Sequence, residues 1–316
     1  MAEFVLKRLL AAIPVLLLVT IVSASIMQLV PGDPAMMIAG QSATTEEITR
    51  IRQELGLDRP YVERMLVWFM GLLRGDLGQS IMLHRSVAQA IVERAPVTLA
   101  LSGFALLLTV LLGVPMGVIA ALRANSWVDQ TVLAVALIGV SVPNFWLSLM
   151  LIVLFGVMLD LLPAGGYIPF ADDPVGWVRC LILPGFSLAL LQIGLVARVT
   201  RATMLEALRQ DYVRTARAKG LPWAKVVGKH ALKNVMIPVI TVIGISFGLL
   251  LSGSVVIETV YSIPGMGRLL ANAVFGRDYP LIQGGLLVTA ATLVLLNLVV
   301  DVLYTVLDPR ISYDRD

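Results

Sequence analysis

The chain has 316 residues, of which 58% are hydrophobic and 14% are charged, and its mean hydropathy is +0.88. A typical soluble domain is about 45–50% apolar and about 25% charged, so this composition excludes an ordinary water-soluble enzyme and a disordered chain. The single cysteine, Cys180, excludes an internal disulfide and a multi-cysteine metal site. The net charge is only +3, but the charges are unevenly distributed along the chain.

Six apolar stretches are long enough to cross a membrane as helices, because about 30 Å of hydrocarbon needs about 20 helical residues. In chain order they cover residues 9–30, 97–122, 132–159, 180–197, 235–257 and 281–300. Continuous runs of this length favour helices over β-strands, which are shorter and alternate in polarity. The first run has a basic start and small residues near its end, as a signal peptide has, but it is longer than a usual signal core. We therefore expect an all-α polytopic membrane protein with six transmembrane helices.

The basic residues lie mainly on the side of the two termini. With six spans, that side carries fourteen Lys and Arg residues against seven Asp and Glu, whereas the opposite side carries ten against thirteen. Nine of the fourteen fall within residues 198–233, after the fourth span. Because cytoplasmic loops carry an excess of Lys and Arg, both termini are predicted to be cytoplasmic. Cleavage of the first span would leave the carboxyl terminus cytoplasmic as well.

Residues 31–96 are predicted to form a small helical cap on the outer side. Thr44 and Glu47 have the spacing of a capping box. A second helix is expected over residues 58–74, and a third is expected from Ser86 to Pro96. The second helix has an apolar surface that either packs within the protein, lies on the membrane or binds an extracytoplasmic partner.

The outer loop after the fifth span, residues 258–280, contains two glycines and a proline close together. Their spacing indicates a tight, shaped turn. This turn is either purely structural or a gate or docking contact. The docking candidates are Pro264, Gly265, Gly267 and Arg268.

The cytoplasmic loop, residues 201–234, is predicted to form two helices joined by a hinge. The first helix is expected to end at Lys219, with Gly220 in the left-handed conformation that ends helices. Pro222 is expected to start the second helix, because its missing N–H is harmless in a first turn.

The second helix of this loop is predicted to be amphipathic. A basic stripe, with one lysine every four residues, runs beside a mainly apolar face. The stripe consists of Lys225, Lys229 and Lys233, and the face of Trp223, Val226, Val227 and His230. Such a helix lies on anionic lipid, packs on its own bundle or inserts into a cytoplasmic partner, and its pattern leaves these alternatives open.

Several residues within the spans are candidates for a pathway or gate. Pro143, followed by Asn144, is expected to kink the third span. Small residues four apart form one face of the fifth span, and two polar residues share a face of the sixth; helix packing and pathway lining are both consistent with them. These residues are Gly244, Gly248 and Ser252 in the fifth span, and Asn297 and Asp301 in the sixth.

Two cytoplasmic segments carry a family resemblance. They read Asp211-Tyr212-Val213-Arg214-Thr215-Ala216-Arg217-Ala218-Lys219-Gly220 and His230-Ala231-Leu232-Lys233-Asn234. This pattern resembles the signature of ABC-importer permeases, in particular the dipeptide and oligopeptide permease "B" subunits of the peptide/nickel branch. The general importer motif has Glu-Ala-Ala where this chain has Arg-Thr-Ala, so a glutamate contact to the ATPase is not implied. Shorter motifs in the expected order extend the resemblance over essentially the whole chain.

The resemblance implies a type I ABC-importer permease fold with three parts. These are residues 1–30 with the first span, the extracytoplasmic cap 31–96, and a core of five spans, 97–316, that carries the loop 201–234. It also implies one half of a heterodimer with a second, similar permease, in a bacterial or archaeal plasma (inner) membrane. Two cytoplasmic ATP-binding subunits and an extracytoplasmic binding protein would complete the importer, whose solute is a dipeptide, an oligopeptide, a glutathione-like peptide or nickel.

In that family the amphipathic helix is the coupling helix, which contacts the ATPase. The residues that match the signature, or that shape the hinge and the helix, are the coupling candidates. They are Asp211, Arg214, Thr215, Ala216, Gly220, Pro222, Trp223, Lys225, His230 and Asn234.

The sequence contains no phosphate-binding loop of the form Gly-x-x-x-x-Gly-Lys-Ser/Thr, and no catalytic triad or paired-histidine metal motif is apparent. We therefore expect a transport subunit without catalytic activity and without a cofactor or metal of its own, with ATP bound by partner subunits. The alternative is a stand-alone channel or secondary transporter. It would need ionisable groups within the spans, and only Asp301 qualifies.

Overall fold

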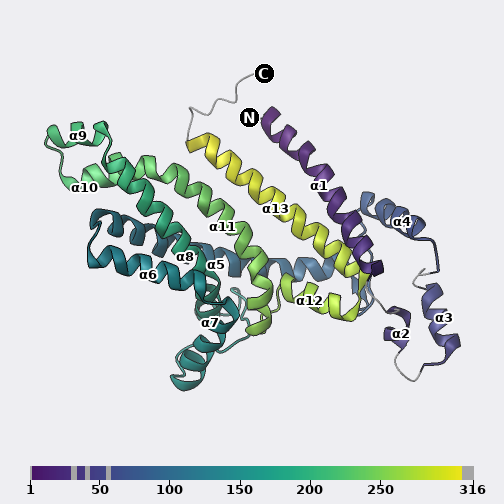
Figure 1. The fold of residues 1–316 in the computed structure, drawn as a ribbon. Coiled ribbons are helices and arrows are strands. Elements are labelled where there is room, and N and C mark those ends of the chain that lie inside the picture. The colour runs from purple at the N-terminus through teal and green to yellow at the C-terminus, as the bar shows by residue number, and fades with distance from the viewer. Residues whose placement is uncertain (1, 30–33, 40–42, 55–57, 308–316) are drawn as a thin grey trace. The chain divides into compact units, whose positions relative to one another are not determined.

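The computed structural model describes residues 2–29, 34–39, 43–54 and 58–307, and this part of the chain is almost entirely helical (Figure 1). Five of its helices are long and apolar enough to cross a membrane, and a sharply bent pair makes six when it is counted as one span. The expectation of an all-α membrane protein is confirmed. A pair of two-residue strands is a small addition to it.

By contact the chain divides into two compact units, residues 1–96 with 265–295, and residues 97–264 with 296–316. The first unit holds the cap and two short strands. Its elements are α1 (Ala2–Leu29), α2 (Pro34–Ala39), α3 (Thr45–Glu54), α4 (Tyr61–Leu73), β1 (Gln79–Ser80), β2 (Arg85–Ser86), the start of α5 (Val87–Leu122), α12 (Met266–Gly276) and most of α13 (Tyr279–Leu307).

The capping box in the cap is confirmed. The backbone N–H of Thr44 donates to the Glu47 carboxylate at 2.8 Å, and the Glu47 N–H donates back to Thr44 Oγ1 at 3.3 Å. These bonds to Thr44, the backbone bond first, lower the pKa of Glu47 below its ordinary value. Thr44 stands just before α3 and Glu47 is in its first turn, whose N–H donors have no partner within the helix.

A small antiparallel hairpin between α4 and α5, which the sequence did not predict, contacts the loop between α12 and α13. Its strands β1 and β2 pair with Gln79 opposite Ser86. The carboxylate of Asp278, just before α13, is buried and accepts from Ser80 Oγ at 2.5 Å and from the Met82 N–H at 3.0 Å. Strands of two residues are too short to show an alternating pattern in the sequence. The hairpin could not be predicted, because it depends on this long-range contact.

The third cap helix and the second span are one helix, α5, and the expectation that a helix ends at Pro96 is wrong. Pro96 lies inside α5. A proline within a helix removes one hydrogen bond and is costly, but packing of the turns on both sides offsets this cost. Val87 and Ile91 are buried before Pro96, and Val97 and Leu101 are buried after it.

The second unit contains the rest of α5 and the remaining helices. These are α6 (Trp127–Ser141), α7 (Asn144–Leu151), the π-helix η1 (Ile152–Met158), α8 (Pro174–Leu208), α9 (Asp211–Ala218), α10 (Trp223–Lys225), the π-helix η2 (Val226–Ala231) and α11 (Leu232–Val260). Helix α8 is central, with contacts to α6, α7, α11 and η2. Its 35 residues correspond to about 52 Å, so it extends beyond the hydrocarbon thickness.

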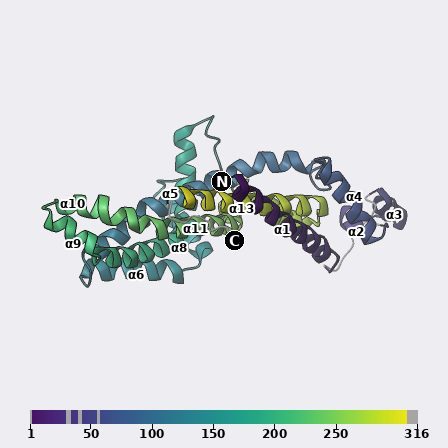
Figure 2. The ribbon, with the colours of Figure 1, turned by 90° about the horizontal axis from the view of Figure 1, so that it is seen from above.

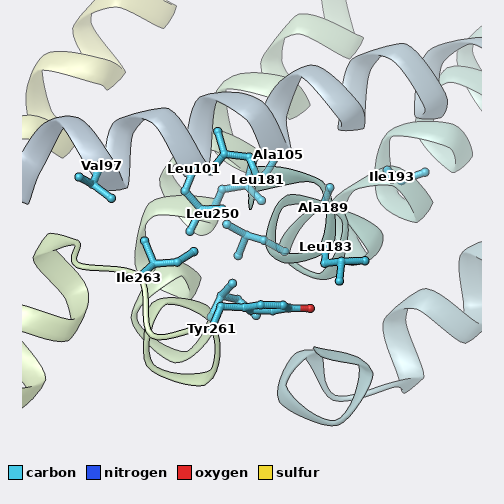
Figure 3. Packing of buried hydrophobic residues seen from close by; sticks show 12 residues of the cluster. Val97, Leu101, Ala105, Leu181, Leu183, Ala189, Ile193, Leu250, Tyr261 and Ile263 are labelled. Carbon is cyan, nitrogen blue, oxygen red and sulfur yellow. The ribbon is translucent and has the colours of Figure 1, made fainter. Parts of the chain in front are cut away.

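The core of this unit is built by α5, α8 and α11, whose side chains point toward one another (Figure 3). Leu101 of α5, Leu181 of α8 and Leu250 of α11 are each at most 1% exposed. Glycines bring the helices close together. A Cβ on Gly117 of α5 would lie 2.5 Å from the carbonyl oxygen of Ala197 on α8. Close approach of backbones at small residues is typical of membrane helices.

The third span is broken rather than kinked at Pro143. Helices α6 and α7–η1 are bent by 103° relative to each other. Val142 has extended dihedral angles, and Pro143 stands at the N-cap of α7. The missing proline N–H therefore falls at a helix start, where no intrahelical partner is required.

Candidate functional site

The turn after α9 has the geometry that the sequence predicted. Gly220 has φ of +77°, its N–H donates to the carbonyl of Arg217 at 2.9 Å, and the N–H of Leu221 reaches the carbonyl of Ala216 at 3.4 Å. This pair of bonds is a Schellman motif, which requires a left-handed residue at the position of Gly220. The left-handed hinge is confirmed.

The helix after this hinge differs from the expectation. After Pro222 the chain forms one turn of α10, then the π-helix η2, and continues without a break into α11, so residues 223–260 form one helix of 38 residues. The prediction of a separate amphipathic helix that ends near Asn234 is therefore wrong. The sequence has no helix stop there, and a π-helix winds more residues into each turn than the α-helical spacing assumes.

The first helix of the loop is also divided differently. Helix α8 continues through Arg201 to Leu208, and α9 begins at Asp211 after a short turn. In both views α9 and α10 lie at the ends of α8 and α11 (Figure 1, Figure 2). The coupling candidates therefore sit at the tip of two long, packed helices.

The apolar face of the loop packs on its own bundle. Val213 and Ala216 of α9 form a buried cluster with Val226, and Val227 packs with Met204 on α8. Ala216 is only 6% exposed. Among the coupling candidates Ala216 therefore supports the segment from inside and does not reach its surface.

The other face of the segment is exposed and mostly basic. Trp223 is 45% exposed, and the guanidinium of Arg217 lies 5.0 Å from the centre of its ring, a cation–π contact. Asp211 and Arg214 form a surface ion pair at 3.4 Å, which contributes little to stability because both side chains are in water. The remaining exposed candidates are Thr215, Gly220, Pro222, Lys225 and Asn234, together with Lys229 and Lys233, while His230 is half-buried.

The pathway candidates in α11 and α13 divide into two groups. Gly244 is a packing residue, because a Cβ there would lie 2.5 Å from Cγ1 of Val300 on α13. Ser252 and Asn297 are exposed on the single chain, and Gly248 and Asp301 are half-buried. Ser252 Oγ donates to the carbonyl of Gly248 at 3.1 Å, so its hydroxyl is satisfied within the helix.

At the break in the third span, Pro143 is exposed and Asn144 is half-buried. A cavity of about 330 Å³ lies elsewhere, between the loop after η1 and the start of α8, with Asp160, Asp173 and Arg179 in its wall. None of the predicted pathway residues lines that cavity. In the described part of the chain, no three His, Cys, Asp or Glu side chains are grouped as metal ligands.

The outer-loop docking candidates are mostly inside the protein. Gly265 is the N-cap residue of α12 and Gly267 is in its first turn, and both are buried. Pro264 and Arg268 are half-buried. The two glycines therefore belong to the start of a helix, α12, that was not predicted within this loop.

Buried polar contacts between helices were missed by the sequence reading. Tyr261 Oη lies 3.1 Å from Ser187 Oγ on α8, and Ser246 Oγ of α11 donates to Gln192 Oε1 on α8 at 3.0 Å. Thr98 Oγ1 donates to the carboxylate of Glu258 at 2.5 Å. Two further contacts of this kind tie Asp129 to Arg201. The available signal was the presence of a polar residue within or beside an apolar run, which does not identify its partner.

Comparison with known proteins identifies this arrangement. Residues 113–313 match the family described as binding-protein-dependent transport system inner membrane component, and residues 1–102 match the N-terminal region of such membrane components. The chain belongs to this family. It is therefore a multi-pass inner membrane permease component of an ABC transporter, and ATP binding resides in partner ATPase subunits. A binding protein is the other partner that the family implies.

Relatives of this permease cover its whole length. It is 49% identical to a putative peptide transport system permease protein of Brucella suis, over 99% of this chain and all of that protein. It is 40% identical to a dipeptide transport system permease protein of Alkalihalophilus pseudofirmus and 38% identical to one of Escherichia coli, with 99% and 100% of this chain covered and all of each relative.

A likeness to a solved structure concerns the fold. A chain from an inward-facing crystal structure of the MetNI methionine ABC transporter matches with a TM-score of 0.58 and 18% identity, covering 70% of this permease and 97% of that chain. The permease fold expected from the sequence is thereby confirmed. The family match also removes the reason to regard the chain as a stand-alone channel or secondary transporter.

Proposed function

We propose that this permease is one of two similar membrane subunits of an importer for peptides, driven by two cytoplasmic ATP-binding subunits. The observation that carries the peptide assignment is the set of full-length relatives described as peptide or dipeptide permeases at 38–49% identity. The likeness extends over the spans, the cap and the cytoplasmic loop together, so it does not depend on one shared motif.

The ATP-binding subunit is proposed to contact the exposed face of α9 and the hinge after it. This face carries Asp211, Arg214 and Thr215, then Gly220 and Pro222, and then Trp223 and Lys225. A half-exposed tryptophan held by a cation–π contact is a rigid apolar anchor, and the surrounding basic residues suit an acidic partner. His230 and Asn234 extend this face toward α11, and Ala216 supports it from inside.

Both termini and the α9 segment are proposed to be cytoplasmic, because this side carries the excess of Lys and Arg. The cap and the loop of Pro264 to Arg268 then lie on the outer side, where a binding protein delivers the solute. In the spans, the exposed Ser252 and Asn297 are proposed to face the second subunit or the pathway, since a polar group facing lipid is costly.

The hinge glycine provides the test of coupling. Proline fixes φ near about −65° and has no N–H, so Gly220→Pro removes both the φ of +77° and the bond to Arg217. Gly228→Ala is the matched control, because Gly228 lies in the same segment with no atom within 4 Å of an added Cβ. Strain of about 1–3 kcal/mol at such a position corresponds to an about 5- to 150-fold loss in a conformational equilibrium.

The measurement is uptake of a labelled dipeptide into proteoliposomes that contain the whole transporter, purified through a tag on this chain. Gly220→Pro is expected to keep membrane insertion and to lose uptake per ATP hydrolysed, while Gly228→Ala behaves like the wild type. Wild-type uptake per ATP hydrolysed in Gly220→Pro would contradict the proposed coupling role of this segment. Failure of the wild-type complex to transport any peptide would remove the substrate assignment.

A further inference from the structure

A buried ion pair links the start of α6 to the cytoplasmic part of α8. Arg201 donates from Nε and Nη2 to the two carboxylate oxygens of Asp129, and the Nη2 to Oδ2 distance is 2.6 Å. The Asp129 side chain is 3% exposed and that of Arg201 is 21% exposed. Two parallel charge-assisted bonds fix the orientation of both groups as well as their distance.

Asp129 also organises the short turn between α5 and α6. Its Oδ2 accepts from the N–H of Asn125 at 2.9 Å, and Asn125 is left-handed, with φ of +64°. The N–H of Asp129 donates to Oγ of Ser126, the N-cap of α6, at 3.4 Å. One carboxylate therefore holds the α5–α6 turn in shape and attaches it to α8.

On its other side, the same part of α8 carries the cytoplasmic segment. Met204 and Ala207 of α8 pack in one cluster with Val227 and Ala231 of η2. Arg201 is seven residues before the end of α8 at Leu208, or about 10 Å along the helix. The last two turns of α8 thus lie between the α5–α6 turn and the segment that follows the hinge.

Elsewhere along their contact, α6 and α8 approach each other closely at two glycines. A Cβ on Gly194 of α8 would lie 2.8 Å from the carbonyl oxygen of Ala136, and one on Gly139 of α6 would lie 3.0 Å from that of Leu190. Glycine against backbone gives close approach of the two helices. The ion pair adds a directional attachment at the end of the interface nearest to α9.

We propose that the Asp129–Arg201 pair is a positioning clamp, which makes the α5–α6 turn move with the cytoplasmic end of α8 when the ATP-binding subunit displaces α9. The inference rests on the proposed contact of α9 with the ATPase. It assigns a role in transport to two residues outside the segment that is proposed to contact the ATPase.

Arg201→Lys tests the clamp most gently, because lysine keeps the charge but replaces the planar fork by a single ammonium group. The readout is uptake per ATP hydrolysed in proteoliposomes, together with the thermal midpoint of the purified complex. We expect the ratio to fall about tenfold, the factor that corresponds to loss of one charge-assisted hydrogen bond. Arg198→Lys, an exposed position on the same helix, is the control and should match the wild type.

A neutral double variant separates coupling from folding. Asp129→Asn with Arg201→Gln removes both charges, so no unpaired charge remains buried, but the attachment is weaker. The clamp predicts that this complex assembles with a near-wild-type midpoint and still transports less per ATP. Wild-type coupling in the double variant, or in Arg201→Lys, would show that the pair only stabilises the fold and would overturn the proposal.

The same holds if Arg198→Lys loses as much coupling as Arg201→Lys, since the effect would then come from replacing an arginine anywhere on this part of α8 and not from the pair with Asp129. Normal coupling in Gly220→Pro, by contrast, would count against the proposed ATPase contact. The clamp is tested independently by the uptake per ATP hydrolysed in Arg201→Lys.

Discussion

Removal of one hydroxyl, in Tyr261→Phe, tests how three helices of the second unit are held together. Tyr261 follows α11 and is 1% exposed. Its Oη lies 3.1 Å from Ser187 Oγ on α8 and donates to the carbonyl of Ser148 on α7 at 3.3 Å. Ser187 Oγ also donates to the carbonyl of Leu183 at 2.9 Å. The hydroxyl groups of Tyr261 and Ser187 have two hydrogens for these three contacts, so only two of the three hydrogen bonds are made at any moment.

Because of this count, Tyr261→Phe loses about one hydrogen bond, and the expected destabilisation is about 0.5–1.5 kcal/mol. Tyr261→Ala also empties the space of a ring that packs in the core cluster, and should cost about 3–5 kcal/mol. Ser187→Ala leaves the phenol free to donate to Ser148 and also loses about one hydrogen bond, so it should cost about as much as Tyr261→Phe. The double variant loses both bonds and should cost about the sum of the two single changes.

The assay is thermal unfolding of the purified transporter in one detergent, followed by the midpoint, for the wild type, the three single variants and the double variant. A cost of the double variant well below the sum of the two single costs would mean that fewer than two of these bonds are made in the wild type. A midpoint for Tyr261→Phe as low as that of Tyr261→Ala would refute the hydrogen count, because the hydroxyl would then outweigh the ring.

Two further outcomes follow from close contacts and from a cap. Gly117→Ala is expected to destabilise the transporter by about 1–3 kcal/mol because its Cβ would overlap α8, whereas Gly103→Ala, with open space on the same helix, should be neutral in the same unfolding assay. The bonds from Thr44 lower the pKa of Glu47, so its stabilising effect is present above the unfolded value and is lost as pH falls through the folded value. Amide exchange in α3, corrected for its intrinsic pH dependence, should lose protection in acid, and Glu47→Gln should abolish that pH dependence.

The sequence predicts which segments cross the membrane better than it predicts where their helices end. Hydropathy marks apolar residues, but a helix continues through polar ones until a stop signal or a loss of packing ends it. Helix α8 therefore runs past Arg198 and Arg201 to Leu208, eleven residues beyond the predicted span. Helix α5 likewise begins at Val87, ten residues before the span that was expected.

In residues 211–234 the sequence correctly predicted the features that depend on neighbouring residues, but it did not predict the contacts between residues far apart in the chain. Gly220 was recognisable because a left-handed helix end depends on a few consecutive residues. The inward orientation of Ala216 depends on Val226, beyond the hinge, and the partner of Asp129 is 72 residues away. No periodicity within one helix encodes such pairs, so they required the structure.

Proline positions show the same dependence on surroundings. Pro184 in α8 and Pro238 in α11 lie within continuous helices, whereas the chain breaks by 103° at Pro143. Burial does not decide the outcome, because Pro184 is buried and Pro238 half-buried, whereas Pro96 and Pro115 are exposed and still lie within the continuous helix α5. At Pro143 the break coincides with the extended backbone of Val142. The direction taken by α7 after the break must then be set by contacts beyond it. The bond from Tyr261 to Ser148 is one of these, which links the end of α11 to the orientation of α7.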